Sequence, residues 1–216
     1  GRLGADIKVL IGDLSEAQCP AKLVDDALKA FGGLDAVVSN AGITSPAPLI
    51  DLSVSKWDKL LNVNTRATLL LAQAAYPALK ESKGALVAVA SMSGMGAHPG
   101  MGAYSPSKAA LISLCQVLAQ EWACDGINVN TVSPGMIRTP LTQKVYENNQ
   151  IAKERAALVP WGRVGNPEDI SNVISFLLSP EANYITGQNI LVDGGFVDSL
   201  YRHIPGLPDS SEIDKT

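Results

Sequence analysis

The sequence predicts an α/β fold: a single domain with one doubly wound parallel sheet. Apolar runs typical of buried strands lie at residues 7–11, 34–38, 85–90 and 127–132. Helical patterns alternate with them at residues 20–31, 56–80 and 103–123. Strands that alternate with helices form parallel sheets, and ligands bind beyond the carboxyl ends of such strands. We therefore expect the functional side chains directly after the apolar runs.

The first two expected strands end in residues suited to turns. Asp13 follows the first run and is a good N-cap for the helical segment after it. The second run leads to Asn40, Ala41 and Gly42, a sequence typical of a strand-to-loop turn. Small residues at this place would also let a ligand approach the backbone closely. Both interpretations of this turn stay open.

The third expected strand leads to a serine, and the helix after it contains a tyrosine and a lysine. Ser91 follows residues 85–90, and a glycine-rich stretch connects it to Tyr104 and Lys108. The latter two lie four residues apart, so their side chains share one helix face. A nearby cation stabilises phenolate and lowers a tyrosine pKa from about 10 toward neutrality. The pattern predicts Tyr104 as a general acid/base.

The tyrosine and lysine alone are weak evidence. Amphipathic helices often carry such a pair with the tyrosine packed on the core and the lysine solvated. Ser91 changes the balance, because a strand end, a loop and a helix start converge on the same place. Ser93 is the alternative hydroxyl, and the thirteen-residue spacing between Ser91 and Tyr104 favours Ser91.

Several motifs, taken in order, resemble those of the single-domain type of the short-chain dehydrogenase/reductase family. They are Asp13-Leu14, Asn40-Ala41-Gly42, Asn64 within Asn62-Val63-Asn64, Ser91, Tyr104, Lys108, Asn130, Ser133-Pro134-Gly135-Met136-Ile137-Arg138-Thr139, Ile185-Thr186-Gly187-Gln188 and Val192-Asp193-Gly194-Gly195. The resemblance extends over residues 4–196. It implies a Rossmann-like fold and a nicotinamide cofactor, NAD or NADP, as the partner of a small alcohol or carbonyl substrate.

The resemblance also implies roles for single residues. The catalytic set is Asn64, Ser91, Tyr104 and Lys108. The cofactor-binding set is Asp13, Leu14, Asn40, Ala41, Gly42, Tyr104, Lys108, Pro134, Gly135, Ile137 and Thr139. In that family the asparagine binds a water that relays protons to the lysine, whereas the plain alternative for Asn64 is a surface position on a helix. Asp13 would contact adenine, and Lys108 the nicotinamide ribose. The Ile137 backbone and the Thr139 hydroxyl would contact the carboxamide and phosphate side.

The activity implied is hydride transfer between the nicotinamide and a secondary alcohol/ketone pair. Tyr104 would protonate the carbonyl oxygen and Ser91 would hydrogen-bond it. One alternative is a 3-oxoacyl-acyl-carrier-protein reductase of the same family, which a basic docking patch would favour. Another is a non-catalytic binding or assembly protein that retains the fold.

A segment typical of the family is not found before Asp13. Family members begin with a strand, a glycine-rich phosphate loop and a helix, followed by a strand whose end selects NAD or NADP. No Gly-x-x-x-Gly-x-Gly pattern precedes Asp13. We expect this N-terminal βαβ portion to be absent from the sequence, either because the chain is truncated or because the molecule carries it beyond the printed residues. The sequence therefore leaves the choice of nucleotide open.

Composition narrows the class of protein. With 216 residues, 46% of them hydrophobic, the chain can form one sizeable core. A net charge of -4 without a basic run argues against nucleic acid as a partner. The longest apolar stretch, residues 68–75, is too short to cross a membrane. Three cysteines and two histidines lack metal-ligand spacing, so we expect no metal and a cytoplasmic protein with reduced thiols.

The second half of the chain is expected to determine substrate specificity and to form the contacts of an oligomer. Residues 1–196 form the dinucleotide-binding catalytic domain, in which residues 141–165, with two helical patterns, are a substrate lid. Asn166 begins the next helix as an N-cap followed by proline and two acids. Residues 109–123 are apolar on more than one side, which favours burial against a second copy, and the family resemblance implies a homo-oligomer, a tetramer or dimer. Residues 197–216 form an extended or frayed tail.

Overall fold

The protein is a parallel α/β structure, as predicted. The computed structural model describes residues 6–205. Its sheet has four parallel strands in sequence order, β1 (Ala36–Ser39), β2 (Ala85–Val89), β3 (Asn128–Pro134) and β4 (Asn189–Val192). Because all four run in the same direction, their carboxyl ends meet at one edge of the sheet.

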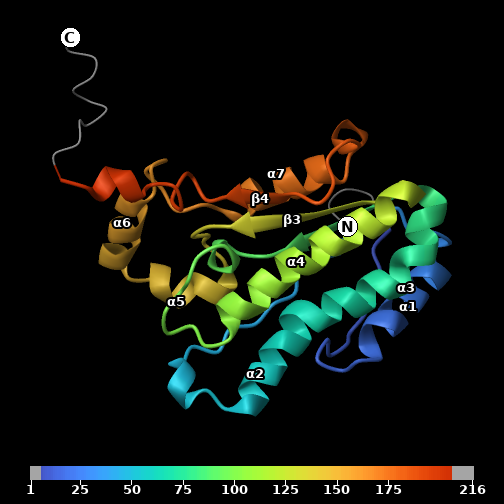
Figure 1. Cartoon of the computed structure of the whole chain (residues 1–216), viewed down its shortest axis with the longest axis horizontal. Coiled ribbons are helices and arrows are strands. Elements are labelled where there is room, and N and C mark those ends of the chain that lie inside the picture. The colour runs from blue at the N-terminus through green and yellow to red at the C-terminus, as the bar shows by residue number, and fades with distance from the viewer. Residues whose placement is uncertain (1–5, 206–216) are drawn as a thin grey trace, which may run out of the picture.

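Helices cover both faces of the sheet (Figure 1). They are α1 (Cys19–Phe31), α2 (Val54–Leu61), α3 (Ala67–Ser82), α4 (Tyr104–Trp122), α5 (Gln143–Tyr146), α6 (Asn149–Leu158) and α7 (Pro167–Leu177). One face of the sheet is covered by α1, α3 and α4. The core on this face includes Leu79, Leu86 and Leu111. α7 packs on the other face, where Val87, Ile170 and Leu177 are buried. The sheet is therefore wound on both sides.

The first apolar run does not form a strand, which corrects the prediction for residues 7–11. Ile7, Val9 and Ile11 are 71%, 80% and 98% exposed, and the segment has no regular structure. A strand is held by hydrogen bonds to a neighbour and by apolar cover on its faces. Within residues 6–205, β1 pairs only with β2, so this segment has no ladder partner.

The long helix expected at residues 56–80 is interrupted. α2 ends at Leu61, a π-helical turn covers Asn62–Arg66, and α3 continues from Ala67. π-turns cost regular hydrogen bonding and often mark functional sites. The side chain at the centre of this turn is Asn64, which is 1% exposed.

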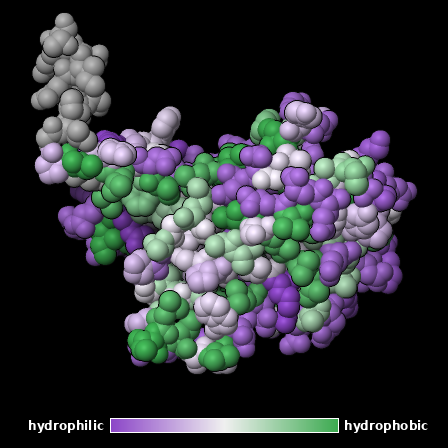
Figure 2. Space-filling view, in the orientation of Figure 1, coloured by the Kyte–Doolittle hydropathy of each residue, from purple (hydrophilic) through white to green (hydrophobic). Residues whose placement is uncertain are grey.

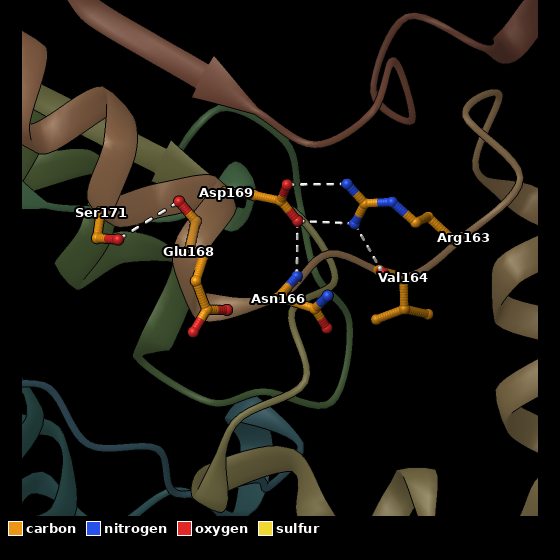
Figure 3. A network of polar contacts seen from close by, with 6 residues as sticks. All are labelled: Arg163, Val164, Asn166, Glu168, Asp169 and Ser171. Carbon is orange, nitrogen blue, oxygen red and sulfur yellow. Dashed lines mark hydrogen bonds and ion pairs between the residues drawn. The ribbon is translucent and has the colours of Figure 1, made fainter.

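The start of α7 confirms the cap predicted at Asn166. Asn166 and Asp169 form a reciprocal capping box, and the Asn166 backbone N–H donates to Asp169 Oδ2 at 2.7 Å. Figure 3 shows the Arg163 guanidinium joined to the same carboxylate by two hydrogen bonds, of 2.7 and 2.8 Å. These bonds hold the pKa of Asp169 well below its usual range, so Arg163 is neutralised within the chain.

Two further properties of the described residues bear on function. Across residues 6–205, no helix combines the length and apolarity needed to span a membrane. In the same range no three histidine, cysteine or acidic side chains come together in a way that could hold a metal ion.

Candidate active site

The four predicted catalytic side chains come from three segments that meet at the carboxyl edge of the sheet. Ser91 lies just beyond β2, Tyr104 and Lys108 occupy the first turns of α4, and Asn64 lies in the π-turn. Ser91, Lys108 and Asn64 are all buried, and Tyr104 is partly exposed. The burial of these polar groups requires hydrogen-bond partners, which the structure supplies.

Ser91 is held as a hydrogen-bond donor toward the phenol. Its Oγ accepts the backbone N–H of Ser93 at 3.1 Å, because Ser91 caps the short 3-10 turn Met92–Gly94. The Ser91 hydroxyl is close enough to the phenol of Tyr104 to lower the pKa of that phenol. With one lone pair occupied by the Ser93 amide, the hydroxyl proton is free to point at the phenol oxygen.

Tyr104 departs from the prediction in its acidity. Burial raises the pKa of the phenol above 10, and the hydrogen bond with Ser91 lowers it only in part. The expected lowering by Lys108 is not found, so the prediction of a tyrosine tuned toward neutrality was wrong for the chain alone. At neutral pH Tyr104 is therefore a phenol, which suits it to donate a proton.

Lys108 is a buried amine next to this phenol. Its Nζ donates to the backbone oxygen of Val89 at 2.7 Å and lies 5.9 Å from the centre of the Tyr104 ring. Burial lowers the pKa of Lys108 to about 8. Burial of the phenol itself, and not the lysine, is what raises the pKa of Tyr104.

Asn64 joins two parts of the site. Its Oδ1 accepts the Ile43 N–H at 2.8 Å, and its Nδ2 donates to the Ile43 oxygen and to Ser107 Oγ, each at 3.0 Å. The loop after β1 is thereby tied to α4. The alternative of a surface asparagine is wrong, since the side chain is fully buried.

We predict that Asn64→Ala destabilises the fold by about 2–4 kcal/mol, because both backbone groups of Ile43 lose a buried partner. Urea unfolding would measure the change. Asn62→Ala is the matched control, since Asn62 lies in the same turn and its side chain makes no hydrogen bond within residues 6–205. Equal stability of the two variants would contradict a stabilising link through Asn64 between the loop after β1 and α4.

Sequence reasoning missed Ser107. This hydroxyl, buried completely, donates to the Tyr104 backbone oxygen at 2.7 Å and accepts from Asn64. A serine three residues after the tyrosine can bond back along its helix, and this spacing was the available signal. Ser93, the rejected alternative to Ser91, instead pairs with His98 Nδ1 at 2.9 Å.

Known proteins are similar to this chain in sequence and in fold. The model of the family described as enoyl-(acyl carrier protein) reductase matches residues 1–197. The 3-oxoacyl-acyl-carrier-protein reductase FabG of Thermotoga maritima is 39% identical over 178 residues, which are 82% of this chain and 71% of that protein. The chain belongs to the short-chain dehydrogenase/reductase family. As a member of this family it is an NAD(P)-dependent oxidoreductase.

Two further proteins show how widely the similarity to this short-chain dehydrogenase/reductase extends. The (3R)-3-hydroxyacyl-CoA dehydrogenase of Mus musculus is 37% identical over 186 residues, 85% of this chain and 71% of that protein. The structure described as the Pseudomonas aeruginosa RhlG/NADP active-site complex aligns with a TM-score of 0.81 and 31% identity. That alignment covers 87% of this chain and 75% of the other.

The residues around Lys108 suit the nicotinamide half of a dinucleotide. An ammonium has three protons to donate, and within residues 6–205 only the Val89 oxygen accepts one. Gly42 keeps the neighbouring loop close, because a Cβ there would lie 3.3 Å from the Lys108 Nζ. Gly135, after β3, packs so tightly that a Cβ would lie 2.5 Å from the Asp193 Cβ. The available ammonium protons match the hydroxyls of a ribose.

The other predicted cofactor residues lie along the same edge. Leu14, Asn40 and Ala41 line a mostly apolar groove of about 300 Å³. Asp13, exposed at the edge, accepts the Ser15 N–H at 2.8 Å, a bond that lowers the pKa of its carboxyl. Pro134 ends β3. Beyond it the Ile137 oxygen and the Thr139 hydroxyl both bond Thr142, at 2.7 and 3.2 Å.

Proposed function

We propose that this protein interconverts a ketone and a secondary alcohol, with Ser91, Tyr104, Lys108 and Asn64 as its catalytic residues. The observation that carries the proposal is that Ser91, Tyr104 and the Lys108 amine come together at the carboxyl edge of the sheet, with the Lys108 Nζ 5.9 Å from the centre of the Tyr104 ring. A carbonyl oxygen placed there would meet two proton-bearing groups, one of which is acidic enough to transfer its proton.

In the proposed reduction, NAD(P)H supplies the hydride that reaches the carbonyl carbon. Tyr104 transfers its phenolic proton to the carbonyl oxygen. The Ser91 hydroxyl, already oriented by the Ser93 amide, donates a hydrogen bond to the same oxygen and stabilises its developing charge. The high pKa of the phenol favours this direction, since Tyr104 is protonated at neutral pH.

Lys108 and Asn64 would serve proton supply and positioning. Lys108 with a pKa near 8 can both hold and release a proton at physiological pH. We propose that Asn64 takes part through a water relay, as in the family. Its own side-chain bonds to Ile43 and Ser107 support a positioning role, because they fix the loop after β1 against α4.

We further propose that the cofactor lies along Asp13, Leu14, Asn40, Ala41, Gly42, Tyr104, Lys108, Pro134, Gly135, Ile137 and Thr139. The groove lined by Leu14, Asn40 and Ala41 supports a place for the flat adenine ring. The proposed cofactor of this chain is NAD or NADP. The NADP in the RhlG complex is a property of that protein.

A 3-oxoacyl thioester is the second candidate substrate. Two of the similar proteins are described as a 3-oxoacyl-acyl-carrier-protein reductase and a (3R)-3-hydroxyacyl-CoA dehydrogenase. Their reactions interconvert the same pair of functional groups, a ketone and a secondary alcohol. Residues 141–165 contain α5 and α6, as the two helical patterns predicted, and we propose this segment as the substrate lid.

Assembly and location complete the proposal. The outer face of α4, including Ala109, Ser113 and Val117, is exposed in the single chain, and we propose that it is covered in a homodimer or homotetramer. Figure 2 shows apolar side chains near the start of α2, where Leu49 and Ile50 are exposed.

All three cysteines are free thiols, which supports a cytoplasmic location.

The domain boundaries stay as proposed from the sequence, with residues 1–196 as the catalytic domain. Within the tail predicted for residues 197–216, a short 3-10 turn covers Leu200–His203. The rest of the tail after residue 205, like the N-terminal residues 1–5, lies outside the described residues.

Titration with NADH and NADPH tests the function. Trp57, Trp122 and Trp161 provide the fluorescence, and transfer to the nicotinamide reports binding. We expect saturable binding of one nucleotide and its oxidation on addition of a 3-oxo substrate. Folded protein that binds neither nucleotide would overturn the proposal and favour the non-catalytic alternative.

A further inference from the structure

Tyr146, the last residue of α5, holds two arginines against its ring. The Arg138 Cζ lies 5.2 Å from the ring centre and the Arg155 Cζ lies 5.6 Å from it. Arg138 belongs to the loop after β3, whereas Arg155 belongs to α6. Two segments that are separate in the sequence thus bring two positive charges to one aromatic side chain.

Neither guanidinium is paired with a carboxylate among residues 6–205. The acids of the neighbouring helices have other partners, because Gln143 donates to Glu147 at 3.1 Å and Gln150 donates to Glu154 at 2.8 Å. Arg163 shows the contrast, since Asp169 neutralises it (Figure 3). The two arginines over Tyr146 therefore keep their charge unpaired.

The place of this pair is well defined. The Arg138 backbone N–H donates to the Gly165 oxygen at 2.9 Å, which fixes the loop that carries Ile137 and Thr139. Tyr146 itself is only 4% exposed, and its hydroxyl is buried without a hydrogen-bond partner among the described residues. The ring is a fixed platform whose face attracts each guanidinium.

We propose that Arg138 and Arg155, held on Tyr146, form a recognition site for an oxyanion carried by the substrate, a phosphate or a carboxylate. Two unpaired guanidinium charges near one ring raise the local positive potential, and an oxyanion bound by them would lower it. Guanidinium groups bind such oxyanions with paired hydrogen bonds. The assignment of the anion to a substrate rests on the proposed function, whereas the anion site itself rests on these three residues.

Calorimetric titration with matched probes tests the site without requiring turnover. 4′-Phosphopantetheine is compared with pantetheine, which lacks the phosphate, and acetoacetate with its neutral ethyl ester. We expect one anionic probe to bind at least about tenfold more tightly than its neutral partner at low ionic strength. Preference for the phosphate indicates a thioester carrier or coenzyme, and preference for the carboxylate indicates a free keto acid.

Variants assign the preference to the two arginines. Arg138→Gln and Arg155→Gln should each remove most of it, and Arg155→Lys should retain part, because lysine keeps the charge but loses the planar fork. Lys153→Gln removes a charge from the exposed side of α6 and should leave the preference intact. Unchanged unfolding midpoints would show that the variants remain folded. Equal binding of charged and neutral probes, or a preference that survives in the double variant, would overturn the site.

The two proposals can fail separately. Ketone reduction without an anion preference would disprove only the recognition site. An arginine-dependent anion preference in a protein that reduces no ketone with either nucleotide would disprove only the proposed function.

Discussion

Tyr104→Phe is expected to lower the turnover number by about 10²–10⁴, the range associated with loss of a positioned general acid. The substitution removes the only atom of Tyr104 that can transfer a proton and retains the ring. Because Lys108 bonds the Val89 oxygen rather than the phenol, its position should not change. Nucleotide affinity, measured by fluorescence titration, should therefore stay within a few-fold of the parent protein.

Tyr184→Phe is the matched control, since Tyr184 is fully exposed and loses the same hydroxyl. Its turnover should equal that of the parent. Turnover of Tyr104→Phe at the parent level would exclude the tyrosine as the acid. Ser91→Ala should give a smaller loss, because that change removes a hydrogen bond to the oxygen and leaves the proton donor in place.

Lys108→Met is expected to alter both turnover and the pH dependence of stability. Burial lowers the pKa of Lys108 from 10.5 to about 8, so the folded protein carries an unfavourable charge below pH 8. Between pH 8 and 10.5 the folded chain has released this proton while the unfolded chain retains it. Stability contributed by Lys108 therefore rises with pH through this window, by about 3 kcal/mol in total.

Urea unfolding at several pH values between 7 and 10.5 would measure this effect as the difference between parent and variant. Other groups that titrate in the window cancel in that difference, provided that they are unaffected by the substitution. Relative to Lys108→Met, the parent should gain stability as pH rises. Lys153→Met, at an exposed position, should show no such trend. If the difference in unfolding free energy between the parent and Lys108→Met stayed constant with pH, burial would not be destabilising the charged form of Lys108.

The sequence predicted the centre of the site because local rules place it. Ser91 follows a buried strand, and Tyr104 and Lys108 share a helix face by spacing alone, so strand and helix periodicity suffices to bring them to one edge. A close approach to the backbone at Gly42 was one of two interpretations of its turn, whereas Gly135 was predicted from the family resemblance alone. Such features depend on a few neighbouring residues.

Features that depend on distant residues were not predictable. Residues 7–11 have the pattern of a strand, yet a strand also requires a neighbour, which the pattern does not contain. The pKa of Tyr104 depends chiefly on the burial of its own phenol, which the packing of the whole edge determines. The arginines over Tyr146 come from two segments whose packing no local pattern specifies.

The π-turn at Asn62–Arg66 has a consequence for how this chain tolerates changes in length. A π-turn holds one more residue than the α-helical path it replaces. Deleting one residue here would make the helix regular and leave α2 and α3 in place, because the turn absorbs the extra residue locally, but it would change the directions of the side chains within the turn. Asn64 would then no longer face Ile43 and Ser107 together. The extra residue is a geometric spacer, and the length of this helix is set by the active site rather than by helix stability.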